Sequence, residues 1–376
     1  MKKILIKKFI KDTFKLFITV GLVLGVIVWV IQAVNFLDFV TEDGHGFSVY
    51  FLYSIHSLPK IIHRILPFVF FISLFYQITK YENNNELLIF WTNGIKKIQF
   101  INVVALYSIL VLFFQVILGS YISPSAQNEA RSYIRNSNVD FFPALIKEGK
   151  FIDTFSNLTI FIESKNESGI YKNIYLKDVN KKDSEFEEFQ IIYAQKGELI
   201  TNNEEKFFIL YDGEILNKVN NKISNFTFDK VNFNLDKYET KTTGYPKIQE
   251  VPTKDLFSCI YLSYIKEVNK FVAKYLQCKE SSLNDIKQEF LKRVYKPIYL
   301  PLIALMCSLI ILKSKESNDY NKFKLFLFIL IFSIIVISEI SLRFSSTSEV
   351  GTLFFILFPF LSFVLLYTIL IVKKRL

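Results

Sequence analysis

The residues of this sequence whose types suit binding chemistry are basic side chains beside apolar segments. Lys292, Arg293 and Lys296 come directly before an apolar run, and His63 and Arg64 stand near the start of another. Cationic groups at such positions either extend their charged ends to the phosphates of lipid headgroups or bind an anionic substrate. Position alone favours the first role, because Lys and Arg are common at membrane boundaries.

Motifs for other kinds of chemistry are absent. A nucleotide site needs a glycine-rich loop ending in Gly-Lys-Ser/Thr, and the segments starting at Gly94 and Gly149 lack the second glycine and the hydroxyl. His45, His56 and His63 lack the spacing of paired metal ligands. No GxSxG motif of a serine hydrolase occurs. We therefore expect a chain that is not an enzyme and holds no metal or cofactor of its own.

Two further pairs of residues have alternative interpretations. Glu339 and Arg343 lie four residues apart in an apolar run. They can pair on one helix face, whereas ionisable groups inside a membrane segment also favour a functional role. Cys259 and Cys278 can form a disulfide or remain as free thiols, since sequence does not define their geometry.

The elements that must position these residues are long apolar runs. The chain has 376 residues, of which 51% are hydrophobic, too many for a disordered protein. A helix needs about 20 apolar residues to cross a bilayer. Six runs meet this demand, at residues 14–34, 61–79, 98–122, 295–312, 323–342 and 350–372. The sequence predicts an α-helical integral membrane protein with six transmembrane helices, three on each side of a long polar interval.

Basic residues flank these runs mainly on one side. They are Lys2, Lys3, Lys7, Lys8, Lys11, Lys15, Lys80, Lys96, Lys97, Lys313, Lys315, Lys322, Lys324, Lys373, Lys374 and Arg375. Cytoplasmic loops are the ones enriched in Lys and Arg, so both termini are expected in the cytoplasm and the long polar interval outside. The net charge of +10 is then an orientation signal. We expect no nucleic-acid partner, because no recognition helix or aromatic platform lies between the lysines.

The polar interval has the two-residue alternation of half-buried strands. The expected strands are at residues 158–162, 171–179, 189–194, 206–211 and 224–233. Turn residues at 166–169, 196–197, 202–203, 212–213 and 220–221 separate them. We expect an antiparallel β domain at 136–250, a helical return at 251–292, and transmembrane halves at 1–135 and 293–376.

The loop after the second run, residues 82–97, predicts a short cytoplasmic helix. Asparagines can cap its start, Glu86 suits its N-terminal dipole, and Gly94 suits the position after its end. Its apolar side chains are Leu87, Leu88, Phe90 and Trp91. Exposed apolar groups in such a loop indicate contact with lipid or with a partner protein.

At these residues the chain resembles the LptF/LptG family of lipopolysaccharide-export permeases, also called YjgP/YjgQ. The family's loop has Glu-Leu followed several residues later by Gly-Ile, and Glu86, Leu87, Gly94 and Ile95 match it. Further matches are Ser123-Pro124 after the third span, Arg293 before Pro297, and segments 194–197 and 208–213, which look like paired strands of the family's β-jellyroll. The resemblance covers nearly the whole chain and is closer to LptF than to LptG.

The resemblance implies a permease subunit of an ABC transporter in the bacterial inner membrane. Such a subunit extracts lipopolysaccharide from the outer leaflet and passes it to a periplasmic bridge, with its jellyroll in the periplasm. The implied partners are a cytoplasmic LptB-like ATPase that binds ATP and Mg, a second permease (LptG-like or LptF-like), and LptC-like and LptA-like bridge proteins. The loop helix would couple to the ATPase. Spans one and five would form gates, which makes Glu339 and Arg343 candidate gate residues.

The sequence departs from the family at one expected site. Many relatives carry basic residues late in span one, and residues 32–38 have none. The available substitutes as contacts for lipid phosphates are His63, Arg64, Arg293 and Lys296. An alternative function is a membrane sensor or tether with a periplasmic domain and no transport activity, although the short cytoplasmic loops offer no output machinery.

Overall fold

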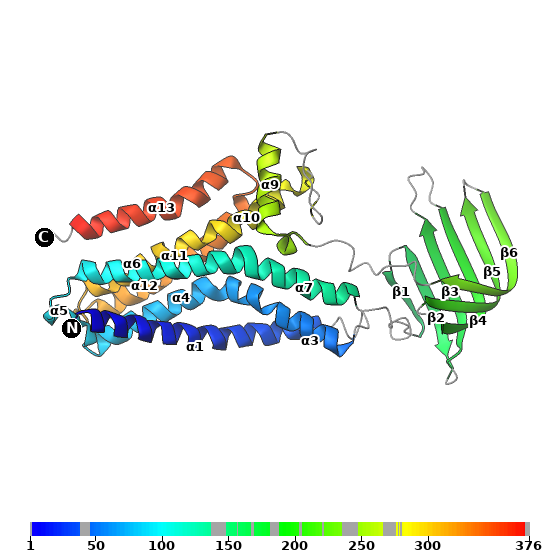
Figure 1. Ribbon diagram of the computed structural model, residues 1–376, viewed down its shortest axis with the longest axis horizontal. Coiled ribbons are helices and arrows are strands. Elements are labelled where there is room, and N and C mark those ends of the chain that lie inside the picture. The colour runs from blue at the N-terminus through cyan, green and yellow to red at the C-terminus, as the bar shows by residue number, and fades with distance from the viewer. Residues whose placement is uncertain are drawn as a thin grey trace. The chain divides into compact units, whose positions relative to one another are not determined.

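The computed structural model divides the chain into a helical unit and a β unit. The helical unit comprises residues 1–34, 54–130 and 246–376, and the β unit comprises residues 35–53 and 131–245. Figure 1 shows the elements of both units. The structure describes residues 2–37, 46–136, 148–155, 157–166, 169–180, 188–202, 205–219, 222–234, 247–265, 276, 278 and 280–372.

Six helices or helix series in the described part of the chain are long and apolar enough to cross a membrane. They are α1 (Lys2–Phe36); α3 (Phe47–His56) with α4 (Leu58–Asn83); α6 (Lys97–Ile117) with the π-helix η1 (Leu118–Ile122) and α7 (Ser123–Asn136); α10 (Leu283–Val294) with η5 (Lys296–Ile298), α11 (Tyr299–Ser308) and η6 (Leu309–Leu312); α12 (Tyr320–Phe344); and α13 (Glu349–Val372). Three precede the β domain and three follow it, as predicted. The helices extend beyond the apolar runs because their polar ends continue the same hydrogen-bonded backbone.

The second and fourth of these spans form the centre of the helical unit. Phe70, Phe71 and Leu74 of α4 and Ala304 and Cys307 of α11 are fully buried in one hydrophobic cluster. By contrast, α1 and α13 bury few of their apolar side chains and leave many exposed. Exposed apolar surface of this extent requires lipid or a partner protein to cover it.

The β unit contains one antiparallel sheet in which each strand pairs with the next in sequence. Its strands are β1 (Lys150–Phe155), β2 (Leu158–Lys165), β3 (Tyr171–Asn180), β4 (Glu188–Asn202), β5 (Glu205–Val219) and β6 (Lys222–Asn234). Alternate side chains such as Ile160, Ile174 and Phe208 form a single buried core on one face, because successive side chains of a strand point to opposite faces. The inserted antiparallel, jellyroll-like β domain is confirmed.

Two predicted turns are wrong, because their residues lie inside long strands. Ala194 pairs with Gly213 and Gly197 pairs with Leu210, so β4 and β5 continue through both segments. Asp212 in β5 and Asn173 in β3, the strand on the other side of β4, have φ values of 53° and 50°. Left-handed backbone at such residues bends a strand without ending it. Asp212 and Asn173 therefore mark bends of the sheet at this position.

Of the other three predicted turns, one is confirmed. The backbone N–H of Gly169 donates to the carbonyl of Asn166 at 2.9 Å, and Gly169 has a φ of 82°. The turns at 202–203 and 220–221 include residues 203, 220 and 221, which lie outside the described residues.

The helical return contains η2 (Ile248–Glu250), α9 (Thr253–Tyr264) and η4 (Glu280–Ser282). Cys259 and Cys278 form a disulfide, which decides between the two interpretations of this pair. Cys259 is fully buried with Val251, Leu256 and Ile286 in a small apolar cluster. The disulfide thus joins α9 to the chain that leads into α10.

We expect reduction of this disulfide to destabilise the return segment. The bond closes a loop with a sequence separation of 19 residues, and a loop of that size contributes about 3 kcal/mol in the chain-entropy view. The double substitution Cys259→Ser/Cys278→Ser should therefore lower the apparent melting temperature in detergent. Dithiothreitol should lower it for the parent protein but not for the double variant. Equal melting temperatures of parent and variant would contradict a stabilising role.

Candidate functional site

The predicted loop helix is α5 (Glu86–Thr92), which follows α4 after a tight turn. Asn85, at its N-terminal cap, has a left-handed backbone with φ 59°. Gly94 has φ 72° just beyond its C-terminal end. Asn and Gly adopt this conformation at low cost, so both ends of the short helix are defined by local sequence.

One face of α5 packs into the hydrophobic core of the helical unit. Leu87 is 1% exposed and Phe90 is 2% exposed. The Phe90 ring lies 6.2 Å from that of Tyr81 in α4 and 5.8 Å from that of Phe100 in α6. The expectation that Leu87 and Phe90 are displayed to a partner is therefore wrong: helical periodicity turns them toward α4 and α6.

The opposite face of α5 exposes two neighbouring aliphatic side chains. Leu88 is 58% exposed and Ile89 is 50% exposed. Trp91 is half-buried, with its ring 6.0 Å from that of Phe100. Sequence reasoning missed Ile89, although Leu87 and Phe90 lie three residues apart, the spacing that indicates one shared helix face.

The N-terminal turns of α1 hold α5 in place. Lys8 Nζ lies 3.2 Å from Glu86 Oε2, and Lys2 Nζ donates to the Gly94 carbonyl at 2.9 Å. Nearby, Tyr81 Oη donates to Asp12 Oδ2 at 2.7 Å. The exposed face of α5 is thus carried on a helix fixed to α1, α4 and α6.

Comparison with known proteins identifies this combination of six apolar helices, loop helix and inserted sheet. Residues 7–373 match the family model described as "Lipopolysaccharide export system permease LptF/LptG". The chain belongs to the LptF/LptG family.

One curated relative also matches part of this chain. The chain is 24% identical over 239 residues to the uncharacterized protein RP871 of Rickettsia prowazekii (strain Madrid E). The match covers 63% of this chain and 65% of that protein. The chain thus spans slightly less than two thirds of this relative's length.

At the other end of the helical unit, the LptF/LptG chain places Arg293 in a structural role. Arg293 is 1% exposed. Its acceptors are Glu289 Oε1 at 3.0 Å, the Val251 carbonyl at 2.8 Å, Thr253 Oγ1 at 3.0 Å, the Ile248 carbonyl at 3.3 Å and the Gln249 carbonyl at 2.9 Å. A guanidinium has five N–H donors, so these bonds occupy its donors. The expectation that Arg293 contacts a lipid phosphate is therefore wrong for this structure.

Lys296 also has a protein partner. It is 6% exposed and forms an ion pair with Glu339 of α12. The pairing of Glu339 with Arg343, which their four-residue spacing allows, is not the one found. Arg343 is exposed instead, and no side-chain partner is found for it among the described residues. The Lys296–Glu339 pair thus connects the fourth span to the fifth.

We expect loss of either partner of this pair to destabilise the helical unit. A hydrogen bond to a charged group contributes about 1.5–3 kcal/mol, and Glu339→Ala leaves the buried Lys296 ammonium unpaired. Glu339→Ala should therefore lower the apparent melting temperature more than Arg343→Ala does. The double variant Lys296→Met/Glu339→Met should recover most of the loss, since it removes both charges. No recovery would mean that the pair itself is not the cause.

His63 and Arg64 line a polar cavity of about 120 Å³ between α4, η1, α7 and α10. Other residues lining it include Lys60, Gly119, Glu289, Lys292 and Arg293. His63 is 8% exposed, and its Nδ1 has no hydrogen-bond partner among the described residues. A Cβ at Gly119 would lie 2.8 Å from His63 Nδ1, so glycine in the π-helix leaves the space that the imidazole occupies.

The structure thus separates the four predicted phosphate contacts. His63 and Arg64 face a cavity in which basic side chains outnumber the single carboxylate of Glu289. Lys60 and Lys292 join them there. The sequence places Lys292 at the membrane boundary, whereas Lys60 was missed, although it lies one helical turn before Arg64. Arg293 and Lys296 are engaged by protein groups.

Proposed function

We propose that this LptF/LptG chain is the permease subunit of an ABC transporter that extracts lipopolysaccharide from the outer leaflet of the inner membrane. In this proposal, a separate LptB-like ATPase binds ATP and Mg and drives the change in the membrane helices. The observation that carries the proposal is the exposed Leu88–Ile89 face of α5, with Glu86 beside it, on a helix anchored to three spans. A rigid helix can transmit displacement to the spans that hold it.

The distribution of charge supports the orientation that the proposal needs. Lys2 and Lys8 lie at the same end of the helical unit as α5. Loops rich in Lys and Arg remain in the cytoplasm, which puts α5 on the side of the ATPase. Both termini are then cytoplasmic and the β domain is periplasmic. There it would pass lipid to LptC-like and LptA-like bridge proteins.

The cavity at the outer end suits the chemistry of the proposed substrate. Lys60, Arg64 and Lys292 bring positive charge beside the buried imidazole of His63, and such groups bind phosphate by charge-assisted hydrogen bonds. Arg293 would position the cavity wall through its contact with Glu289. A second permease, LptG-like or LptF-like, would face the exposed sides of α1 and α12, where Glu339 and Arg343 are candidate gate residues.

The proposal predicts that Leu88→Asp/Ile89→Asp separates the chain from its ATPase without unfolding it. Both positions are exposed, so the carboxylates of the introduced aspartates stay in water in the isolated chain. They would lose this water only where α5 contacts the ATPase. Loss of two central apolar contacts at about 1–2 kcal/mol each corresponds to a tenfold or larger loss of affinity. The measurement is the amount of ATPase that co-purifies in mild detergent, with Asn318→Asp in the next cytoplasmic loop as a matched control.

The same experiment distinguishes the proposal from a sensor or tether without transport activity. Such a protein has no ATPase to lose, so the parent chain would purify without one. Undiminished co-purification of an ATPase with the Leu88→Asp/Ile89→Asp variant would reject α5 as the docking site.

A further inference from the structure

Helix α9 of the return segment has two apolar faces, of which the fold uses one. Leu256 and Cys259 on the inner face are fully buried against Ile286 and its neighbours. The opposite face carries Phe257, Tyr261 and Tyr264, which are 55%, 56% and 89% exposed. At 100° per residue these three aromatic side chains lie within one narrow sector of the helix. If the outer side of α9 faced water, these three large aromatic side chains would be exposed there without a partner that stabilises them.

The position of α9 along the helical unit can be estimated from two spans. The hydrocarbon core is about 30 Å thick and is crossed by about 20 helical residues. Counted outward from Ile98 in α6, the boundary is reached near Leu118, so that Ser120 lies ~3 Å beyond it. Counted outward from Leu312, it is reached near Tyr295, so that Phe290 lies ~7 Å beyond it.

Direct contacts attach α9 to both of these positions. Thr253 Oγ1, in the first turn of α9, donates to the Ser120 carbonyl at 2.6 Å. The Phe257 ring lies 5.9 Å from the ring of Phe290. Each headgroup layer is about 5–7 Å thick, so two independent spans place α9 within that layer on the side opposite α5.

The direction of α9 keeps its whole length in this layer. In Figure 1 the long helices of the helical unit run roughly along one axis, and α9 runs across them. It packs on the flank of α10 through contacts with Ile286 and Phe290 rather than over the end of that helix. Phe257, at the edge of the exposed face, borders Phe290 of α10, whereas Tyr261 and Tyr264 are exposed at the flank, where lipid surrounds the protein.

Helix α9 is attached at its start and at its middle. Arg293 Nη1 donates to Thr253 Oγ1 and to the carbonyl of Val251 before it. The Cys259–Cys278 disulfide joins the middle of α9 to the chain that leads into α10. These contacts leave the exposed face no freedom to turn inward and cover itself.

We propose that α9 is an interfacial membrane helix whose Phe257, Tyr261 and Tyr264 face binds the headgroup layer of the outer leaflet. Tyr side chains are enriched at this depth because the ring is apolar and the hydroxyl reaches water. The exposed face contains one cation, Lys254, at its start, so binding rests on the aromatic rings and not on anionic lipid. The inference needs the membrane orientation only and is independent of ATPase coupling and of lipopolysaccharide.

A nitroxide at Tyr264→Cys, on the full-length chain in phosphatidylcholine nanodiscs, tests this placement. Cys307 is buried and Cys259 and Cys278 are bridged, so the new thiol is the reactive one in the described part of the chain. Ser224→Cys on β6 is the water-exposed reference, and Ile329→Cys on α12, which is 55% exposed, is the lipid reference. The readouts are collision rates with oxygen and with a water-soluble nickel chelate.

If the aromatic face is buried about 5–10 Å at the membrane boundary, the nitroxide at position 264 should have a several-fold lower nickel collision rate than the one at Ser224→Cys. Its oxygen collision rate should be near that of the one at Ile329→Cys. Adding phosphatidylglycerol should leave both rates unchanged. Phe257→Ser/Tyr261→Ser should raise nickel access at position 264 several-fold. Nickel access equal to that of Ser224→Cys would overturn the proposal in favour of water. Protection from both reagents would overturn it in favour of a covering protein surface.

Discussion

Reversal of one charge, Glu86→Lys, is expected to reduce ATPase-coupled export by about tenfold or more. In the proposed contact, Glu86 would lose its partner on the ATPase and the new lysine would face that partner's like charge, which together cost several kcal/mol. The fold should survive, because the Lys8–Glu86 pair is exposed at 60% and 26% and such pairs contribute about 0.2–1 kcal/mol. The measurements are ATP hydrolysis and lipid release by the reconstituted transporter.

The double variant Lys8→Glu/Glu86→Lys shows which contact of Glu86 matters. It restores an ion pair between α1 and α5 with its polarity reversed. If Glu86 acts by touching the ATPase, the double variant remains as defective as Glu86→Lys. If Glu86 only positions α5 through Lys8, activity returns. Full activity of Glu86→Lys itself would contradict both roles.

Arg293→Ala is expected to be the most destabilising substitution in the outer part of the helical unit. It removes a guanidinium that is 1% exposed and leaves Glu289, at 14% side-chain exposure, without its buried partner. Breaking a buried pair in this way costs about 3–5 kcal/mol. The carbonyls of Gln249 and Val251 lose the guanidinium donor at the same time, so η2 and the start of α9 should loosen. Thermal unfolding in detergent measures the effect.

Two neighbouring variants define the cause of this loss. Arg293→Lys keeps the charge but replaces the planar fork by a compact ammonium, so it should remain substantially destabilised. Lys292→Ala removes a cation that is 29% exposed and contacts Glu289 at 2.9 Å, and its effect should stay below about 1 kcal/mol. An unchanged melting temperature for Arg293→Ala, with weaker lipid binding, would return Arg293 to the role of a phosphate contact.

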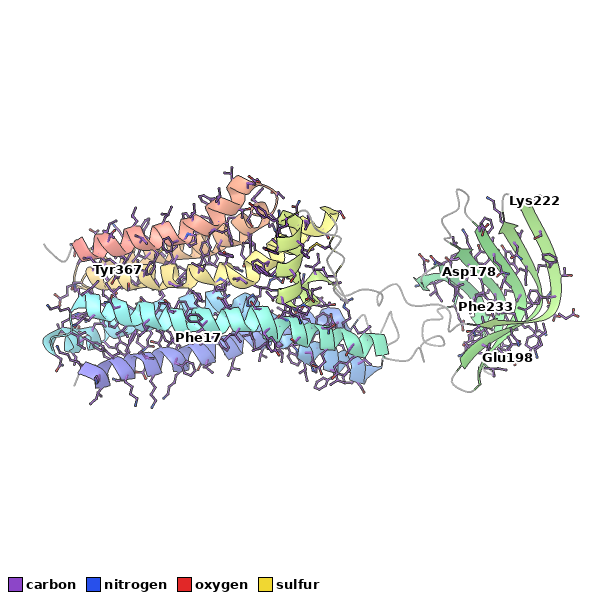
Figure 2. The ribbon with its side chains drawn as sticks, turned by 45° about the horizontal axis from the view of Figure 1, so that its top comes forward. Phe17, Asp178, Glu198, Lys222, Phe233 and Tyr367 are labelled. Atoms are coloured by element: carbon purple, nitrogen blue, oxygen red, sulfur yellow. A yellow bond between two sulfur atoms is a disulfide. The ribbon has the colours of Figure 1, made fainter. Side chains whose placement is uncertain are left out.

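Sequence reasoning succeeded for the elements, among them the helices of Phe17 and Tyr367 and the strand of Phe233, which Figure 2 labels, and not for their contacts. Phe17 of α1 and Tyr367 of α13 belong to apolar runs whose lengths alone identify membrane helices. Phe233 of β6 lies in the buried core of the sheet, as the alternation around it predicts. These properties depend on consecutive residues, so they can be predicted without knowledge of the rest of the chain.

Residues that make distant contacts were assigned incorrectly for a common reason. Leu87 and Phe90 are apolar, and apolar side chains suit both an exposed docking face and a buried face. Only the positions of α4 and α6 show that these two side chains are buried. Asp212 and Gly213 suit a turn and a strand bend equally well, and the pairing of β5 with β4 and β6 selects the bend.

The sequence by itself determined the six membrane helices, the inserted β domain, the membership of the LptF/LptG family and the likeness of the α5 loop to its motif. Run length, alternation and local motifs each depend on residues that are neighbours in the sequence. The sequence alone is therefore enough to predict these features. The tertiary structure alone decided which face of α5 is exposed, that Arg293 holds η2 and α9, and that Lys296 pairs with Glu339. Polar partners are decided by distance in space, and the partners Arg293–Val251 and Lys296–Glu339 lie more than 40 positions apart in sequence.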